Sequence, residues 1–205
     1  IIGHLKEITK GVRFGEDTNK FLKFTDEFSD LEGFETFIRK ASIGGDPKGW
    51  LFAAEGIAYL SKSSDVVRDT IKIERKLIST ELTPDILFKN QKTGQWIIAD
   101  FKSGSFDNLK SSEIIDIKKY NEIAISGQLG SDTKVIVFSD EYDIASATRI
   151  EKETGAKVVQ VTRDENNNLI FPFVFSTLPP IPPPHPIAIS PNHTSGTYVF
   201  PVNVT

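Results

Sequence analysis

The chain has 205 residues, a quarter of them charged, and a formal net charge of −4. It contains no cysteine, which excludes thiol catalysis, disulfides and thiolate metal sites, and no apolar run long enough to span a membrane. The negative charge argues mildly against a nonspecific nucleic-acid binder, because counterion release favours basic surfaces. The length suits one domain with appendages. Since the chain starts at Ile1 and contains no methionine, we expect a fragment or a processed product.

Residues 1–47 are predicted to form a helical N-terminal cap. Large apolar residues recur at roughly helical spacing in two segments, 18–28 and 30–41. We interpret this region as a cap that packs on the following domain and carries no separate activity.

The segment 48–60 is predicted to be a helix with a carboxylate in its apolar stripe. Glu55 is surrounded at helical spacing by apolar side chains. A carboxylate there is costly unless it is paired or binds a metal. Two interpretations follow: Glu55 belongs to a functional site, or it forms an ion pair with an Arg or Lys at the edge of the core.

Two apolar runs, 83–89 and 96–103, are predicted to pair as an antiparallel hairpin around the polar turn 90–95. With the turn centred on Lys92-Thr93, opposed residues have numbers that sum to about 185, so Asp85 faces Asp100 with Cβ atoms about 5 Å apart. A bulge at Gly94 would move this register by one residue and keep the two acids neighbours.

Alternation along the second strand places Asp100 and Lys102 on one face. Trp96 and Ile98 share that face, and the other face is also apolar. We therefore expect a sheet covered on both sides, with the acids near the mouth of a cleft. Taken singly, Asp85 is as easily a turn residue, and Asp100 with Lys102 a surface pair.

The remainder of the predicted core, 48–175, alternates helices and strands. We expect a helix over 111–126, a strand over 134–139, a helix over 144–154 stopped by Gly155, a strand over 157–162 and an edge strand over 169–175. The last part, 176–205, is a proline-rich tail with no charged residue, and its proline run favours polyproline II.

A helix with Glu55, a strand, Pro84-Asp85 on the next strand and Asp100-x-Lys102 on a third resemble the PD-(D/E)xK phosphodiesterase superfamily. The resemblance covers roughly 48–162. It implies an α/β fold with a restriction-endonuclease-like central mixed β-sheet flanked by helices. One departure is Asp100, where Glu is the commoner residue.

The resemblance also implies a metal-dependent mechanism. Asp85 and Asp100 would hold Mg²⁺ or Mn²⁺, with Glu55 and the backbone carbonyl of Phe101 as further ligands. Lys102 would orient or deprotonate the attacking water, or stabilise the transition state.

On the helix that follows, Lys118 and Tyr120 would reach the scissile phosphate. For Lys118 alone, a solvated helix face is the simpler explanation.

The function expected from the resemblance is an endonuclease acting on DNA or RNA, tRNA included. The methionine-free chain and its helical cap also resemble the C-terminal effector domain of a bacterial polymorphic toxin of the contact-dependent inhibition or Rhs kind. Such a domain would have a cognate immunity protein, would be exported, and would act in a target-cell cytoplasm. Two alternatives are a catalytically inactive nuclease-fold module that binds nucleic acid or protein, and a domain that binds a partner through its tail.

Overall fold

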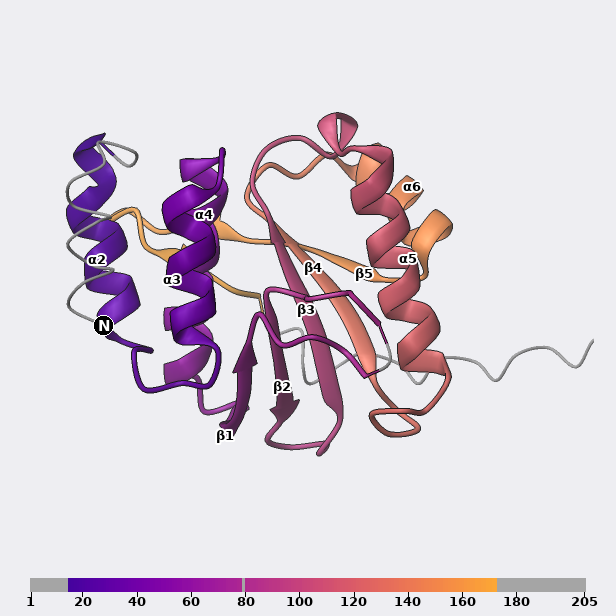
Figure 1. Ribbon diagram of the computed structural model, residues 1–205. Helices are drawn as coiled ribbons and strands as arrows, with labels where there is room; N and C mark the ends of the chain where they lie inside the picture. The colour runs from indigo at the N-terminus through magenta and orange to yellow at the C-terminus, as the bar shows by residue number, and fades with distance from the viewer. Residues whose placement is uncertain (1–14, 79, 173–205) are drawn as a thin grey trace, which may run out of the picture.

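A five-stranded mixed sheet lies at the centre of the computed structural model, which describes residues 15–78 and 80–172 (Figure 1). The strand order is β1-β2-β3-β4-β5; the first three strands are antiparallel, and β3, β4 and β5 run parallel. Their bounds are β1 (Val66–Ile73), β2 (Ile86–Asn90), β3 (Trp96–Lys102), β4 (Lys134–Ser139) and β5 (Lys157–Gln160). The predicted α/β class with a mixed central sheet is confirmed.

Helices cover both faces of this sheet (Figure 1). One face carries α2 (Thr18–Asp26), α3 (Phe34–Ile43) and α4 (Pro47–Lys62), and the other carries α5 (Ser111–Ile125) and α6 (Ile144–Thr154). The helices α5 and α6 are the crossovers that parallel strand pairs require. Short elements complete the described chain: the 3-10 helices η1 (Gly15–Asp17) and η2 (Phe106–Asn108), and the two-stranded pair β6 (Thr162–Arg163) and β7 (Leu169–Ile170).

The alternation of side chains along β3 divides the interior into two apolar clusters. Ile97, Ala99 and Phe101 lie in the cluster beneath α4, and Ile98 lies in the cluster beneath α5 and α6. All four side chains are almost completely buried. The predicted covering of the sheet on both faces is therefore confirmed, and Asp100, with the parity of Ile98, lies on the α5 side.

The second predicted helix of the cap begins later than expected, at Phe34 instead of residue 30. Gly33 adopts φ 94°, and a side chain there would strike the carbonyl oxygen of Ile73. The Glu32 carbonyl accepts a hydrogen bond from the Ile73 amide at 2.8 Å. The chain before α3 is thus held against the edge strand β1, and this contact replaces the first helical turn.

Other boundaries follow local chemistry closely. The strand β4 and the helix α6 have the predicted bounds; the Asp143 side chain caps the start of α6, and Gly155 ends it at φ 74°. The predicted edge strand 169–175 is reduced to the two residues of β7 within the described chain. The predicted tail, 176–205, lies outside the described residues. Within the described ranges, none of the helices combines the length and apolar character needed to cross a membrane.

Candidate active site

Asp85 and Asp100 are interlocked through the backbone of the β2–β3 pair. Ile86 pairs with Ala99, which is the predicted register and brings Asp85 opposite Asp100. The Asp85 amide donates to Asp100 Oδ1 at 3.2 Å, and the Phe101 amide donates to Asp85 Oδ2 at 2.7 Å. Each carboxylate is therefore fixed by an amide near the other acid, at the point where the ladder ends.

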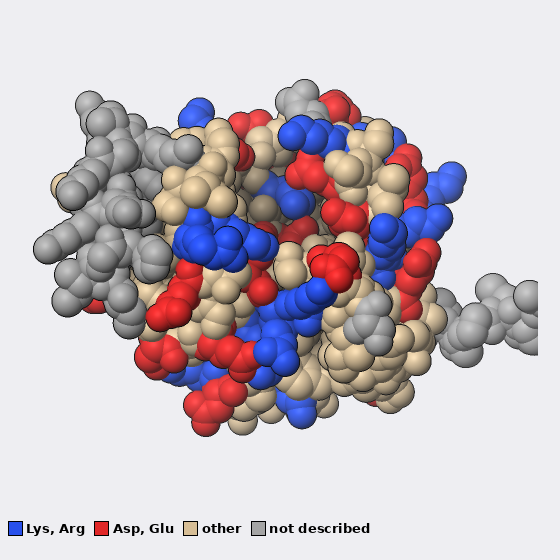
Figure 2. Space-filling model, in the orientation of Figure 1, with Lys and Arg blue, Asp and Glu red and all other residues tan. Residues whose placement is uncertain are grey.

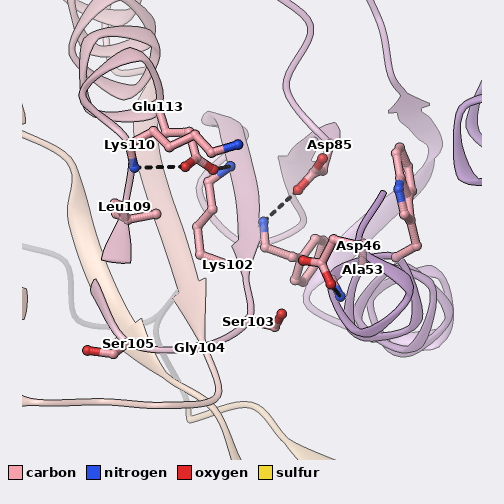
Figure 3. A pocket seen from close by; sticks show the side chains of 13 residues that line it. Asp46, Ala53, Asp85, Lys102, Ser103, Gly104, Ser105, Leu109, Lys110 and Glu113 are labelled. Atoms are coloured by element: carbon pink, nitrogen blue, oxygen red, sulfur yellow. Dashed lines mark hydrogen bonds and ion pairs between the residues drawn. The ribbon is translucent and has the colours of Figure 1, made fainter. Parts of the chain in front are cut away.

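Lys102 lies between two carboxylates from different elements. Its Nζ is 3.1 Å from Asp100 Oδ2. It is also 3.6 Å from Oε1 of Glu113, in the first turn of α5 (Figure 3). The other oxygen of Glu113 accepts a hydrogen bond from the Lys110 amide at 3.0 Å. Sequence reasoning missed Glu113; its position three residues after 110 is the spacing of a capping glutamate, which was the available signal.

A pocket of about 400 Å³ opens over these residues, between the start of α4 and the loop after β3. Asp85 and Lys102 line it, whereas Asp100 is only 5% exposed and lies behind them. The exposed Lys110, which sequence reasoning also missed, lines the pocket and has no ion pair among the described residues. Figure 2 shows a hollow near the centre of this face in which both basic and acidic side chains are visible.

The electrostatics of the pocket are dominated by buried negative charge. Burial raises the pKa of Asp85 well above its ordinary value, and the charges of Asp100 and Glu74 raise it further. Burial alone would lower the pKa of Lys102, but Asp100, Asp85 and Glu113 together raise it. The acids outnumber the cations close to them, so this site favours added positive charge.

Glu74, another residue missed from the sequence, is a third buried acid beside the pair. Its side chain is 3% exposed, and its amide donates to the Asp85 carbonyl at 3.1 Å. Lys40 of α3 pairs with Glu74 and also donates to Thr83 Oγ1 at 3.1 Å. Burial raises the pKa of Glu74, Lys40 opposes this shift, and Asp100 adds to it. The helical cap is thereby joined to the acid cluster.

The structure places Glu55 apart from the acid pair. Glu55 is 8% exposed, and its two oxygens accept hydrogen bonds from the two terminal nitrogens of Arg163, both at 3.0 Å. It lines a different cavity from the one above Asp85. The interpretation of Glu55 as a carboxylate in an ion pair is therefore the one that its contacts favour over a place in the metal shell.

The two predicted residues of α5 differ in placement. Lys118 is on the exposed face of the helix, as the solvated-face explanation expects, and it does not line the pocket. Tyr120 is 5% exposed and faces the acids: burial raises its pKa, and the charges of Asp100 and Asp85 raise it further. Tyr120 belongs to the buried cluster beneath α5 and does not line the pocket.

The oxygen donors of the site fit a divalent cation such as Mg²⁺ or Mn²⁺. Two carboxylates are held close enough for their negative charges to repel each other, and hard cations prefer such oxygen ligands. A bound cation would offset this repulsion. No group of three acidic or histidine side chains arranged to hold a metal occurs among residues 15–78 and 80–172.

No model of a known protein family matches this chain, and a comparison with curated proteins also gives no match. The chemistry of the site is accordingly inferred from its own geometry. The relevant features are the interlocked carboxylates, the adjacent lysine and the pocket above them.

Replacing Asp85 with Asn is expected to raise the free energy of unfolding at neutral pH by an amount on the order of 1 kcal/mol. The folded protein holds the Asp85 proton more tightly than the unfolded chain, where the pKa is near 3.8. The stabilising contribution of Asp85 is thus fully present below that value and is lost as the pH rises through the raised pKa. Urea denaturation in EDTA across this range should show the advantage of Asp85→Asn disappearing toward pH of about 4.

The control is Asp132→Asn, which removes an exposed carboxylate. It should leave the stability unchanged throughout. A wild-type protein as stable as Asp85→Asn at neutral pH would contradict the raised pKa.

Replacing Lys40 with Met should lower the free energy of unfolding by about 2–3 kcal/mol, because Glu74 would stay buried without its ammonium partner. The loss should be smaller than for a fully buried pair, since the Lys40 side chain is 33% exposed. In Lys40→Met/Glu74→Gln, most of the loss should be recovered. Denaturation of the single and double variants tests this, and losses that simply add would show that the two residues are not coupled.

Proposed function

We propose that the protein is a divalent-metal-dependent endonuclease with a restriction-endonuclease-like core over 48–175. The observation that carries the proposal is the pair Asp85 and Asp100, interlocked beside Lys102 under an open pocket. The element order α4-β1-β2-β3-α5-β4 supports it, because it is the order that the PD-(D/E)xK resemblance implies, with Asp85 directly before β2 and with Asp100 and Lys102 on β3.

In this proposal, Asp85 and Asp100 hold the cation, with the Phe101 carbonyl as a further ligand. The bound ion supplies positive charge that offsets the charge developing on the phosphate. The ammonium of Lys102 lies next to Asp100 at the pocket wall, where it would donate to a phosphate oxygen or orient the attacking water. Lys110, unpaired among the described residues, would bind a phosphate at the rim.

The substrate we propose is DNA or RNA, tRNA included. The chemistry of the pocket is directed at a phosphodiester, which both polymers share. From the resemblance we further propose that the domain is the effector of a polymorphic toxin that meets a cognate immunity protein and acts in a target-cell cytoplasm.

Replacing Asp100 with Ala should abolish cleavage, with a loss of about a thousandfold or more, because the pair then loses one of its two metal-binding carboxylates. Plasmid DNA, total RNA and tRNA would be incubated with the wild type and the variant in Mg²⁺, Mn²⁺ or EDTA. Near-ultraviolet circular dichroism would establish that the variant is folded. Asp132→Ala, an exposed acid removed, is the matched control and should cleave normally.

Cleavage by folded Asp100→Ala would contradict the assignment. No cleavage of any substrate by the folded, metal-loaded wild type would instead favour the inactive nuclease-fold module.

Replacing Lys102 with Ala should lower kcat by about a hundredfold or more while changing the affinity for Mn²⁺ little, since Lys102 is not a ligand. The affinity would be measured by calorimetric titration and kcat by cleavage under saturating Mn²⁺. A loss of Mn²⁺ affinity as large as the loss of kcat would show that Lys102 acts by holding the acids in place.

A further inference from the structure

A second cavity lies on the opposite flank of α4 from the active-site pocket. It has a volume of about 410 Å³ and is enclosed by α2, α4 and the loop 164–168. Within α4, positions 49, 50 and 53 line the active-site pocket, whereas positions 48, 51, 52 and 55 line the second cavity. At 100° per residue these two sets point to opposite sides of the helix.

The charges of this cavity leave two lysines without partners. Each acid that lines it is already engaged: Asp17 with Lys20 at 3.4 Å, Glu55 with Arg163, and Asp140 as the acceptor of the Gly104 amide at 3.1 Å. Lys23 of α2 and Lys48 of α4 line the same cavity, are exposed, and have no ion pair among the described residues.

The guanidinium of Arg163 adds a fixed positive group to the wall of the cavity. Glu55 holds it from one side, and the Asn167 carbonyl accepts a hydrogen bond from it at 2.8 Å. Its side chain remains 34% exposed, so it contributes to the cavity as well as to the ion pair. A concave surface with two unpaired ammonium groups and an oriented guanidinium is suited to a phosphate.

The two cavities share one edge of the sheet. The loop after β3 lines the active-site pocket, Asp140 directly follows β4 and lines the second cavity, and the Gly104–Asp140 hydrogen bond joins the two segments. Ligands commonly bind at the carboxyl ends of parallel strands. A helix is about 10–12 Å across, a distance that a polynucleotide strand spans in a few nucleotide steps.

We propose that the second cavity binds a phosphate of the substrate strand, a few nucleotides from the bond that is cleaved. This inference rests on the proposed nuclease function and adds a subsite to it. The polynucleotide passes over the first turn of α4, with Lys102 and Lys110 on one flank and Lys23 and Lys48 on the other.

The test measures binding separately from cleavage. Fluorescein-labelled DNA duplex and single-stranded RNA are titrated with the protein in EDTA at several salt concentrations, and binding is followed by anisotropy. Relative to the wild type, Lys23→Ala/Lys48→Ala should bind about tenfold more weakly, and the magnitude of the salt slope should fall by about 0.9 for duplex or about 0.7 for single strands, as expected for the loss of one phosphate contact. The polymer for which the variant loses more affinity is the one that the subsite accepts.

The matched control is Lys119→Ala/Lys152→Ala, which removes two exposed lysines of α5 and α6 that have no ion pair among the described residues. It should keep the wild-type affinity and slope. An equal loss in the control, or no change of slope in Lys23→Ala/Lys48→Ala, would overturn the subsite.

A small substrate separates this inference from the proposed function. Bis(p-nitrophenyl) phosphate is too short to reach across α4, so its Mn²⁺-dependent hydrolysis should be the same in the wild type and in Lys23→Ala/Lys48→Ala. A loss of this hydrolysis in the variant would overturn the inference, because the lysines would then be acting on the active-site pocket. If the wild type hydrolyses neither this ester nor a polynucleotide, the nuclease proposal fails; a reduced salt slope in the variant would still establish the phosphate site.

Discussion

The register of the β2–β3 pair is the constraint on which the candidate site depends. The pairing of Ile86 with Ala99 places Asp85 opposite Asp100, and two backbone amides then fix the two carboxylates. A slip of one residue would send Asp100 to the other face of the sheet, into the cluster beneath α4. The apolar side chains of β3 prevent this slip, because both faces are buried and each residue has its own packing partners.

Holding acids together at the end of a buried strand is costly, and the surrounding structure offsets the cost only in part. Lys102 compensates Asp100 from within the same strand, and Lys40 compensates Glu74 from the helical cap. The pKa of Asp85 nevertheless stays raised. A fold selected only for stability would gain by replacing such an acid with an apolar residue, so the retained negative charge favours a role in binding a cation.

The parts of the site that depend on local pattern could be predicted from the sequence. The polar turn between the two apolar runs limited the register to two choices, of which the structure has the one centred on Lys92-Thr93, and strand alternation placed Lys102 on the same face as Asp100. Contacts between distant segments could not be predicted in this way. Helical spacing indicated that Glu55 is buried, but its partner Arg163 is 108 residues away and no local pattern connects them. Glu74 lies beside the acids with its own backbone at φ 51°, a conformation that its sequence neighbours do not indicate.

The helix α4 both packs on the sheet and lines two cavities. Its apolar face packs on β3, where Gly56 leaves room for the ring of Phe101, and its two flanks form walls of separate cavities. This division explains why an acid of the helix can be buried without joining Asp85 and Asp100: Glu55 lies on the flank of Lys48, and the candidate active-site pocket is on the other flank. On the flank of Lys48, Glu55 orients Arg163, so the same carboxylate that the sequence suggested as a metal ligand contributes to the proposed phosphate subsite through its ion pair.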